Sequence, residues 1–281
     1  MKKVLITIMA LLIFDIFIWG QIAFGKPTSA AKIYALDVGQ GDSELVALPY
    51  GVKILIDGGP NGKVMDKLNS ILSPLDRRID LIILSHPDTD HFSGLINVFK
   101  KYSVGAFIYN GEIGKAESFL DLEKSIKEGN VPVVVLSEGD SIKYENNDFK
   151  FLSPPAGTLE SDGTNSNALV FELSNPDFKA LFTGDIDSKI EKKLIEKYDL
   201  SVDILKVAHH GSKTSTSKEF LKAVKPKVSL IEVGAGNSYG HPTSQVLDNL
   251  KEIGSKIFRT DLSGTIGLEI KDNKISILSE R

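Results

Sequence analysis

Short apolar runs and three-to-four-residue apolar spacings alternate along most of the chain. Runs bounded by glycine, asparagine or charged residues predict strands, which we place at 32–37, 43–48, 53–56, 79–84, 104–108, 131–136, 149–152, 168–173, 178–182, 203–207 and 227–233, with closing strands from Lys256 onward. Apolar residues recurring at helical spacing predict helices at 64–72, 117–126, 188–197, 219–224 and 244–253. The order of these elements predicts an α/β (α+β) protein with hairpin-rich sheets covered by helices.

The N-terminal segment has a different pattern, because Lys2 and Lys3 precede a long apolar stretch at 4–25 with Asp15 as its single charge. A central aspartate costs about 2.5–3.5 kcal/mol on membrane insertion, and the surrounding apolar residues outweigh it at about −0.3 to −0.6 kcal/mol each. The stretch is therefore expected to insert. Cleavage after the small-x-small pattern Ala23-Phe24-Gly25 and permanent anchoring are both open, and a buried first helix is a third interpretation.

With 281 residues, of which 42% are hydrophobic and 25% charged, the chain can bury a full core as one large domain or two small ones. Residues 31–281 have no interior linker or low-complexity segment and are expected to form one domain. Residues 1–30 are expected to be a signal peptide or an N-terminal membrane anchor plus linker. The protein would then be secreted, or anchored through residues 4–25 on the outer face of the cell membrane. The net charge of −4 argues against nucleic-acid binding through a broad basic surface.

The five histidines are confined to three short polar segments at 85–91, 208–212 and 240–242. The first segment places two imidazoles and two carboxylates directly after the predicted strand 79–84; they belong to His86, Asp88, Asp90 and His91. A helix-capping arrangement would explain one aspartate there, but not all four side chains. Nitrogen and oxygen donors at the end of a buried strand instead indicate a metal site.

Two further strands end in candidate ligands. Asp185 follows the strand 178–182, and His209 and His210 follow the strand 203–207. The sequence Thr183-Gly184-Asp185 alone is common in turns and need not indicate function. Two neighbouring buried imidazoles are the stronger signal, because their ring nitrogens need partners. The chain has no cysteine, so any metal must be held by histidine and oxygen donors.

Motifs along the whole chain beyond the N-terminal segment resemble those of the metallo-β-lactamase superfamily, and most closely the hydrolase domain of its ComEC-like competence-protein branch. The matching segments are 37–43, 55–59, 85–94, 165–170, 181–185, 205–212, 237–242 and 259–261. The resemblance implies a four-layer αβ/βα sandwich, in which helices flank two mixed sheets and the metal site lies at the sheet edges.

The resemblance also implies a ligand set for one or two divalent ions. A first ion would be held by His86 and Asp88, a second by Asp90, His91 and His209, with Asp185 as the bridge. The superfamily commonly has histidine where this chain has Asp88, and a further histidine where this chain offers only the asparagines of 165–167. More oxygen in the first site shifts its preference from Zn²⁺ toward Mn²⁺ or Mg²⁺, so Zn²⁺ and Mn²⁺ are the ions we expect overall.

Other polar side chains are expected to support the ligands or the substrate. Candidates for orienting the ligands are Asp57, Asp42 and Asn167. Candidates for acid–base or other catalytic work are Asp90, His210 and His241, and candidates for substrate binding are Lys206, Ser212 and Lys213. Asp57 is alternatively an ordinary strand-ending turn residue, and Lys213 alternatively a solvated surface lysine.

The expected reaction is hydrolysis by a metal-activated water. The ComEC-like resemblance implies an exported or membrane-tethered phosphodiesterase, a nuclease acting on DNA. One alternative is a hydrolase of a lactone, a β-lactam or another small ester, and another is a non-catalytic metal-binding module. Metal analysis together with activity on phosphodiesters and lactones separates the three.

Overall fold

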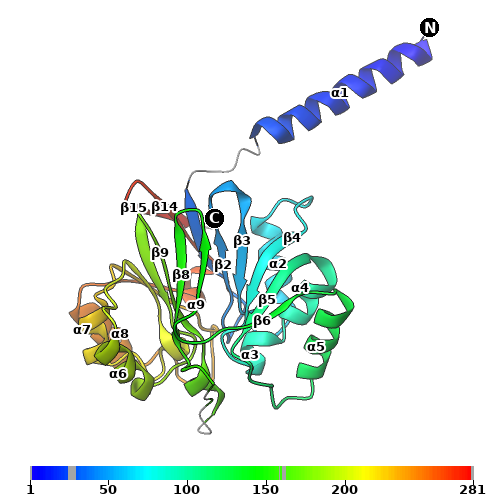
Figure 1. The fold of residues 1–281 in the computed structure, drawn as a ribbon. Helices are drawn as coiled ribbons and strands as arrows, with labels where there is room; N and C mark the ends of the chain where they lie inside the picture. The colour runs from blue at the N-terminus through cyan, green and yellow to red at the C-terminus, as the bar shows by residue number, and fades with distance from the viewer. Residues whose placement is uncertain (1, 25–29, 158, 160–162, 280–281) are drawn as a thin grey trace.

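The computed structural model describes residues 2–24, 30–157, 159 and 163–279. Helix α1 (Lys2–Phe24) carries exposed apolar side chains such as Val4 and Phe17, and Figure 1 shows it outside the layered body of the protein. No helix among the described residues combines the length and the hydropathy needed to cross a membrane. The predicted linker at 25–29 lies outside the described residues, and the division at residue 30 stays a prediction.

Two mixed sheets occupy the middle of the structure, as predicted. The first has the strand order β15-β14-β1-β2-β3-β4-β5-β6, with bounds β1 (Ala31–Ala35), β2 (Glu44–Ala47), β3 (Lys53–Ile56), β4 (Arg78–Ile83), β5 (Ser103–Tyr109), β6 (Val133–Val135), β14 (Ile266–Lys271) and β15 (Lys274–Ser279). The second has the order β13-β12-β11-β10-β9-β8-β7, with bounds β7 (Ser141–Tyr144), β8 (Asn147–Ser153), β9 (Val170–Asn175), β10 (Phe178–Phe182), β11 (Ile204–Lys206), β12 (Val228–Ile231) and β13 (Lys256–Arg259).

Helices cover the outer face of each sheet (Figure 1). The first sheet is covered by α2 (Lys63–Ile71), α4 (Leu95–Lys101) and α5 (Phe119–Glu128), and the second by α6 (Ser188–Lys197), α7 (Lys218–Val224) and α8 (Ser244–Glu252). Shorter turns are α3 (Thr89–Phe92), α9 (Thr260–Ser263) and the 3-10 segments η1 (Pro49–Gly51), η2 (Thr164–Asn167) and η3 (Ala208–Gly211). The predicted four-layer αβ/βα sandwich is confirmed.

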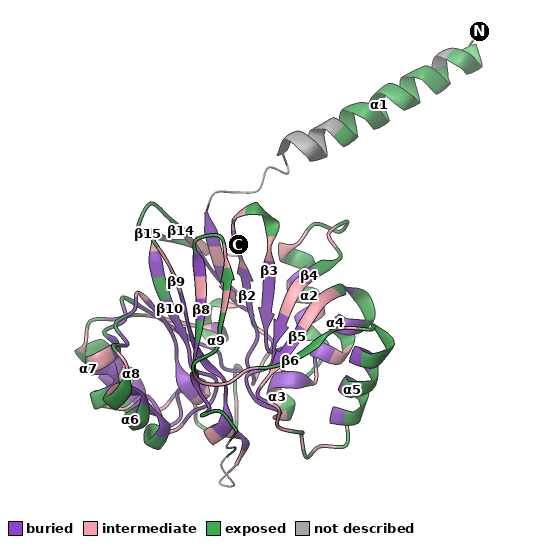
Figure 2. Cartoon of the chain, viewed as in Figure 1, coloured by how far each residue is buried: buried purple, intermediate pink, exposed green. Residues whose placement is uncertain are grey.

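The core explains why the central strands are apolar on both faces. In β3, Leu55 packs into the cluster beneath the helices, while Ile54 and Ile56 pack into the cluster between the two sheets. Successive side chains of a strand point to opposite faces, so a strand covered on both sides needs a continuous apolar run. Each fully buried Leu or Ile contributes about 1.5–3 kcal/mol. Figure 2 shows the same pattern, with buried residues on the strands and exposed ones on the outer helix faces.

Parallel pairing brings the polar motifs to one edge of the sandwich. Strands β3, β4 and β5 are parallel to one another in the first sheet, as are β10, β11, β12 and β13 in the second. The loops that follow β4, β10, β11 and β12 carry the five histidines and Asp185. Two rigid sheets therefore position the side chains of the candidate site.

A close backbone approach lies between the short helices α3 and α4, which follow the first histidine segment. A Cβ added to Gly94 would lie 1.9 Å from the carbonyl oxygen of Gly58, so only glycine fits between the two loops. The Gly58 amide also donates to the carbonyl of His91 at 2.6 Å. The loop after β3 is thereby fastened to the loop that carries the first histidines.

Candidate metal centre

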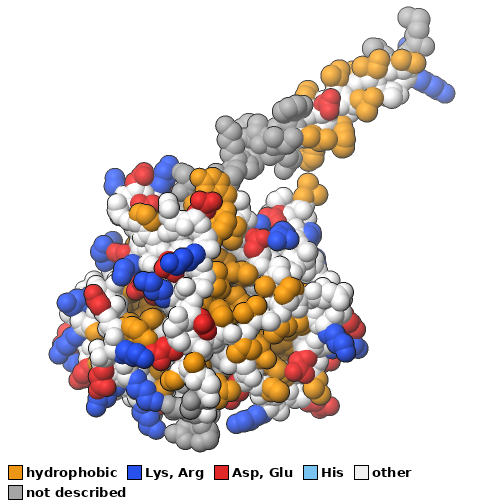
Figure 3. All heavy atoms as spheres, viewed as in Figure 1, with side chains coloured by type: hydrophobic (Ala, Val, Ile, Leu, Met, Phe, Trp, Pro, Cys, Tyr) orange, Lys and Arg blue, Asp and Glu red, His pale blue; other side chains and the backbone are white. Residues whose placement is uncertain are grey.

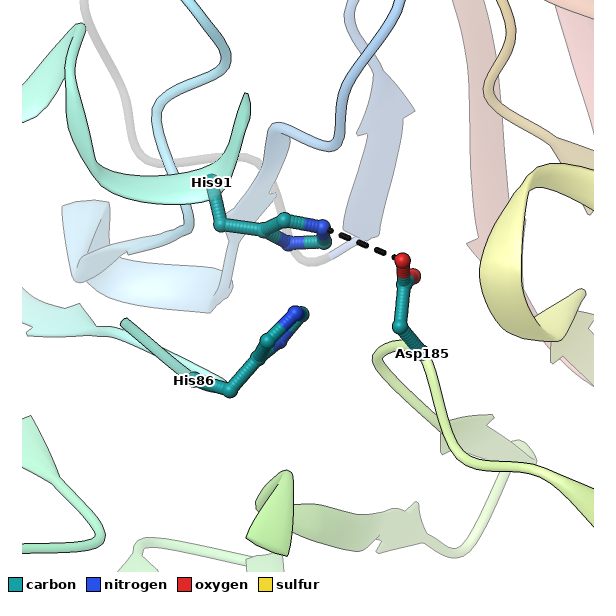
Figure 4. A group of neighbouring side chains, drawn as sticks. All are labelled: His86, His91 and Asp185. Carbon is teal, nitrogen blue, oxygen red and sulfur yellow. Dashed lines mark ion pairs between the residues drawn. The ribbon is translucent and has the colours of Figure 1, made fainter. Parts of the chain in front are cut away.

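Three buried side chains from both sheets converge at the centre of the site. His86 and His91 come from the loop after β4, and Asp185 comes from the loop after β10 (Figure 4). His91 Nε2 lies 3.4 Å from Asp185 Oδ2, and the two imidazole centroids are 4.0 Å apart. One donor atom from each residue falls within 4.8 Å of the others. These three residues could together hold a metal ion, and their role as ligands stays a prediction.

The hydrogen-bonding state of the cluster tests whether it fits a metal ion. His86 Nε2, His91 Nε2 and Asp185 Oδ1 are buried without a hydrogen-bond partner. Buried polar atoms in folded proteins are nearly always paired, because desolvating an unpaired one is costly. Nitrogen and carboxylate oxygen donors of this kind are the ligands of Zn²⁺ and Mn²⁺. The residues present therefore fit a divalent ion.

Asp57, at the end of β3, holds His91 in its orientation. Its Oδ2 accepts from His91 Nδ1 at 2.7 Å and from Ser85 Oγ at 2.6 Å, and its Oδ1 accepts from the Ser85 amide at 2.7 Å. A proton fixed on Nδ1 leaves the lone pair of His91 on Nε2, which faces Asp185. The predicted orienting role of Asp57 accords with these contacts.

His210, a predicted acid–base residue, lies deep in the structure. Its ring is buried, with Nε2 3.4 Å from Asp90 Oδ2 and 3.6 Å from Asp185 Oδ2. Its Nδ1 donates to the carbonyl of Glu232 at 2.8 Å. His210 and Asp90 also form a group of possible ligands with His91. The structure thus places His210 among the donors.

Two predicted ligands occupy the rim of this cluster. His209 Nε2 is 3.8 Å from Asp185 Oδ2, and Asp88 Oδ2 is 3.6 Å from His86 Nε2. In the described part of the chain, neither His209 nor Asp88 belongs to a group of three donors within 4.8 Å of one another. Thr164 Oγ1 donates to Asp88 Oδ1 at 2.6 Å. Their roles as ligands stay predictions.

Lys206 lies behind the donors and not at the mouth of the site, where a substrate-binding lysine is expected. Its side chain is 1% exposed, and Nζ pairs with Asp42 and lies 3.8 Å from Asp185 Oδ1. Glu44 and Glu232 are two buried carboxyl groups that were not among the predicted site residues. One oxygen of each lies within 4.8 Å of an oxygen of Asp42. Glu232 interrupts an apolar run and Glu44 begins one, and a carboxyl group next to a buried strand was the available signal.

Burial and neighbouring charges together set the pKa values of the carboxyl groups in this buried network. Burial raises the pKa of Glu44 to about 8, with the Asp42 charge adding to the effect. Burial would also raise the pKa of Asp42, but Lys206 and His210 outweigh it and lower the value to about 2. The pKa of Glu232 is raised well above its ordinary value, first by burial and then by Glu44. The network therefore favours a protonated carboxyl beside an ionised Asp42–Lys206 pair.

The ligand cluster itself is charged in the absence of metal. Burial opposes ionisation of Asp185, yet His210 and His91 hold its pKa well below the usual range. Burial likewise lowers the pKa of His91, but Asp185, Asp57 and Asp90 raise it well above its ordinary value. Because ligands bind metal in their deprotonated forms, metal binding must displace a proton from the imidazole of His91.

The remaining predicted residues have partners outside the donor cluster, lie beside it or lie at the surface. Asn167 is buried and donates from Nδ2 to Glu112 Oε2 at 3.1 Å, Ser212 bonds through Oγ to Thr214 at 3.0 Å, and Lys213 is exposed. His241 is partly buried, and its ring centroid is 5.8 Å from that of His209. His241 is thus beside the cluster, in agreement with its predicted position.

A four-layer αβ/βα sandwich with His and Asp donors at one edge of both sheets defines a metal-dependent hydrolase of the metallo-β-lactamase fold. The chain belongs to the metallo-β-lactamase superfamily, whose family model matches residues 36–234. The predicted family is confirmed.

The comparisons also identify relatives among competence proteins. The chain is 28% identical to ComE operon protein 3 of Bacillus subtilis (strain 168), over 90% of this chain and 34% of that protein, and 32% identical to competence protein ComA of Neisseria gonorrhoeae, over 85% of this chain and 32% of that protein. It therefore spans about a third of the length of these curated relatives. Among solved structures, the metallo-β-lactamase fold protein YhfI of Bacillus subtilis superposes with a TM-score of 0.59 at 10% identity, over 85% of this chain and 99% of that one.

Proposed function

We propose that the chain is a metal-dependent phosphodiesterase that cleaves DNA. The observation that carries the proposal is the buried cluster of unpartnered donors on His86, His91 and Asp185, in a chain related to competence proteins. Competence is the uptake of DNA, so a hydrolase related to these proteins has a phosphodiester as its expected substrate.

The side chains around the cluster support hydrolysis. A divalent ion held by these residues would lower the pKa of a water molecule from about 15.7 toward about 7 and so make hydroxide available for hydrolysis. Asp57 keeps the Nε2 lone pair of His91 directed at the cluster. Burial, with His209 and His210 adding to it, lowers the pKa of His241. His241 is therefore neutral near pH 7 and is suited to exchange a proton with the substrate.

The donor composition supports Mn²⁺ or Zn²⁺ as the ion, with one or two ions bound. The site offers imidazole nitrogens together with the carboxylates of Asp88, Asp90 and Asp185. Imidazole suits zinc, and additional carboxylates suit manganese. Metal content measured after loading with each ion separately decides between them.

The location of the reaction is proposed to be outside the cell membrane. The exposed apolar side chains of α1 and the relationship to competence proteins support export. Membrane fractionation with sequencing of the mature N-terminus tests this proposal. A soluble mature chain beginning near Lys26 means a cleaved signal, a full-length chain in the membrane fraction means an anchor, and a full-length chain in the cytosol contradicts export.

The activity is tested with the full-length chain, loaded with Mn²⁺ or Zn²⁺ and incubated with labelled single-stranded DNA, a bis-aryl phosphate, a lactone and nitrocefin. We expect cleavage of the two phosphodiesters, loss of that cleavage in Asp185→Ala, and retention of it in Asp248→Ala. Asp248 is a matched control because it lies exposed on α8. Hydrolysis of only the lactone or nitrocefin would exclude a nuclease, and absence of bound metal under all conditions would indicate a non-catalytic module.

A further inference from the structure

An exposed tyrosine stands beside the candidate metal centre, on the loop between β12 and α8. The Tyr239 side chain is 69% exposed, and its ring stacks on that of His241 with centroids 5.9 Å apart and an interplanar angle of 25°. His241 in turn contacts His209, whose Nε2 is 3.8 Å from Asp185 Oδ2. A series of aromatic rings thus leads from solvent to the metal centre, and Tyr239 is its outermost member.

The side chain of Asn237 holds the backbone of this loop in place. Its Oδ1 accepts from the amides of Tyr239 at 3.2 Å and His241 at 3.1 Å. Its Nδ2 donates to the carbonyls of His241 at 2.7 Å and Gly234 at 3.1 Å. Four hydrogen bonds from one side chain fix the backbone that carries both rings. Tyr239 therefore presents an aromatic face to solvent from a fixed position, which lowers the entropic cost of using it for binding.

We propose that Tyr239 is a stacking platform for an unpaired nucleobase, and that the substrate is accordingly single-stranded DNA. This inference rests on the proposed phosphodiesterase function. Exposed aromatic rings bind single strands because every base has a flat face to stack on them. A base within a duplex already stacks on its neighbours, so only an unpaired or flipped base reaches the ring.

The charge distribution makes stacking an important source of affinity. The chain carries a net charge of −4, and Lys206, the buried lysine of the site, is paired with Asp42. On the face shown in Figure 3, lysines and arginines are interspersed with carboxylates. Proteins that hold DNA through its phosphates need clustered basic side chains. A base-stacking contact next to the metal centre supplies affinity that does not depend on such a cluster.

The test compares two oligomers of equal length, a single-stranded oligothymidylate and its abasic counterpart, with the full-length metal-loaded chain. We expect the wild type to prefer the base-bearing oligomer in kcat/KM. Tyr239→Ala should reduce this preference about 5- to 150-fold, which corresponds to about 1–3 kcal/mol of stacking. The effect should appear in KM, because stacking holds the base equally before and during the reaction.

Two matched variants distinguish stacking on the Tyr239 ring from a contact of its hydroxyl group and from the loss of any exposed tyrosine. Tyr239→Phe keeps the ring and should keep the preference, whereas a hydroxyl contact to phosphate would be lost in it. Tyr50→Ala removes a tyrosine of similar exposure, 70%, from the turn between β2 and β3 at the opposite edge of the sandwich, and should also keep the preference. Retention of the preference in Tyr239→Ala, or its loss in Tyr239→Phe, overturns the proposal.

A binding measurement separates this inference from the proposed function. Fluorescence anisotropy of the same oligomers in EDTA reports binding without cleavage, and Tyr239→Ala should weaken binding of the base-bearing oligomer by the same about 5- to 150-fold. If the wild type cleaves neither oligomer but shows this difference in binding, the phosphodiesterase proposal fails and the stacking site stands. If it cleaves DNA without any base-dependent difference, the stacking site fails alone.

Discussion

Replacement of Asp57 by asparagine tests how the site prepares a histidine for metal binding. The asparagine side chain would keep an oxygen for the Ser85 amide, which now donates to Asp57 Oδ1 at 2.7 Å. Its NH2 group would then replace Oδ2, which accepts from Ser85 Oγ at 2.6 Å and from His91 Nδ1 at 2.7 Å. The serine hydroxyl rotates to accept a proton, but a protonated Nδ1 of His91 has no lone pair with which to do so.

The mismatch is relieved only if His91 moves its proton to Nε2 or turns away from residue 57. Either change removes the lone pair that lies 3.4 Å from Asp185 Oδ2 and that would bind the metal. Loss of a partner that orients a ligating histidine commonly weakens metal binding about 10- to 100-fold. The expected loss for Asp57→Asn is therefore about 1.4–2.7 kcal/mol of metal-binding free energy.

Competition with a chromophoric chelator measures this loss, with Mn²⁺ and Zn²⁺ titrated separately into the wild type and the variant. Asp248→Asn is the matched control, because it makes the same replacement on an exposed residue of α8. Circular dichroism and thermal melts of the metal-free proteins show whether the variant has the native fold. A natively folded Asp57→Asn protein with wild-type metal affinity would refute the orienting role.

Three further predictions concern His241, Lys206 and His210. His241→Ala should lower kcat about 10²- to 10⁴-fold with unchanged metal content, since a general acid or base contributes about that much; loss of metal would instead make His241 a ligand. Lys206→Met should destabilise the metal-free chain by about 3–5 kcal/mol in denaturant titrations, because it removes one partner of a buried ion pair, whereas the exposed Lys213→Met should match the wild type. Burial would lower the pKa of His210, but neighbouring carboxylates raise it to about 10. Its protonated form therefore stabilises the metal-free chain fully below about pH 6.5, and melting temperatures in EDTA should fall as the pH rises from there to about 10; a flat profile would contradict a raised pKa.

Features set by local sequence were predictable. The helix predicted at 188–197 coincides with α6, where apolar spacing and the cap both lie within the segment, since Asp187 accepts from the amides of Lys189 and Ile190. The strand predicted at 178–182 coincides with β10. Strand β7 (Ser141–Tyr144) was missed although its polar and apolar residues alternate, because four residues at the edge of a sheet give only a short pattern.

The contacts that assemble the site depend on the packing of the two sheets. Lys206 and Asp42 are 164 positions apart in the sequence, and no local pattern joins them. Likewise, the sequence does not determine which of His209 and His210 points inward. Both adopt left-handed backbone angles in η3, with φ of 51° and 53°, and this turn buries His210 while leaving the side chain of His209 30% exposed. Neighbouring identical residues thus acquire different surroundings from backbone geometry.

The chemistry of the first metal position depends in the same way on a residue distant in sequence. Burial opposes ionisation of Asp88, but the neighbouring His86 and the hydrogen bond from Thr164 lower its pKa to about 2, so the carboxylate is charged. Thr164, on η2, occupies Oδ1 with a 2.6 Å hydrogen bond, which leaves Oδ2, 3.6 Å from His86 Nε2, as the free donor. The pair therefore offers one imidazole nitrogen and one anionic oxygen where the superfamily commonly offers two imidazoles. Because carboxylate donors suit manganese better than imidazoles do, Thr164 would contribute to the metal preference if Asp88 is a ligand, as predicted.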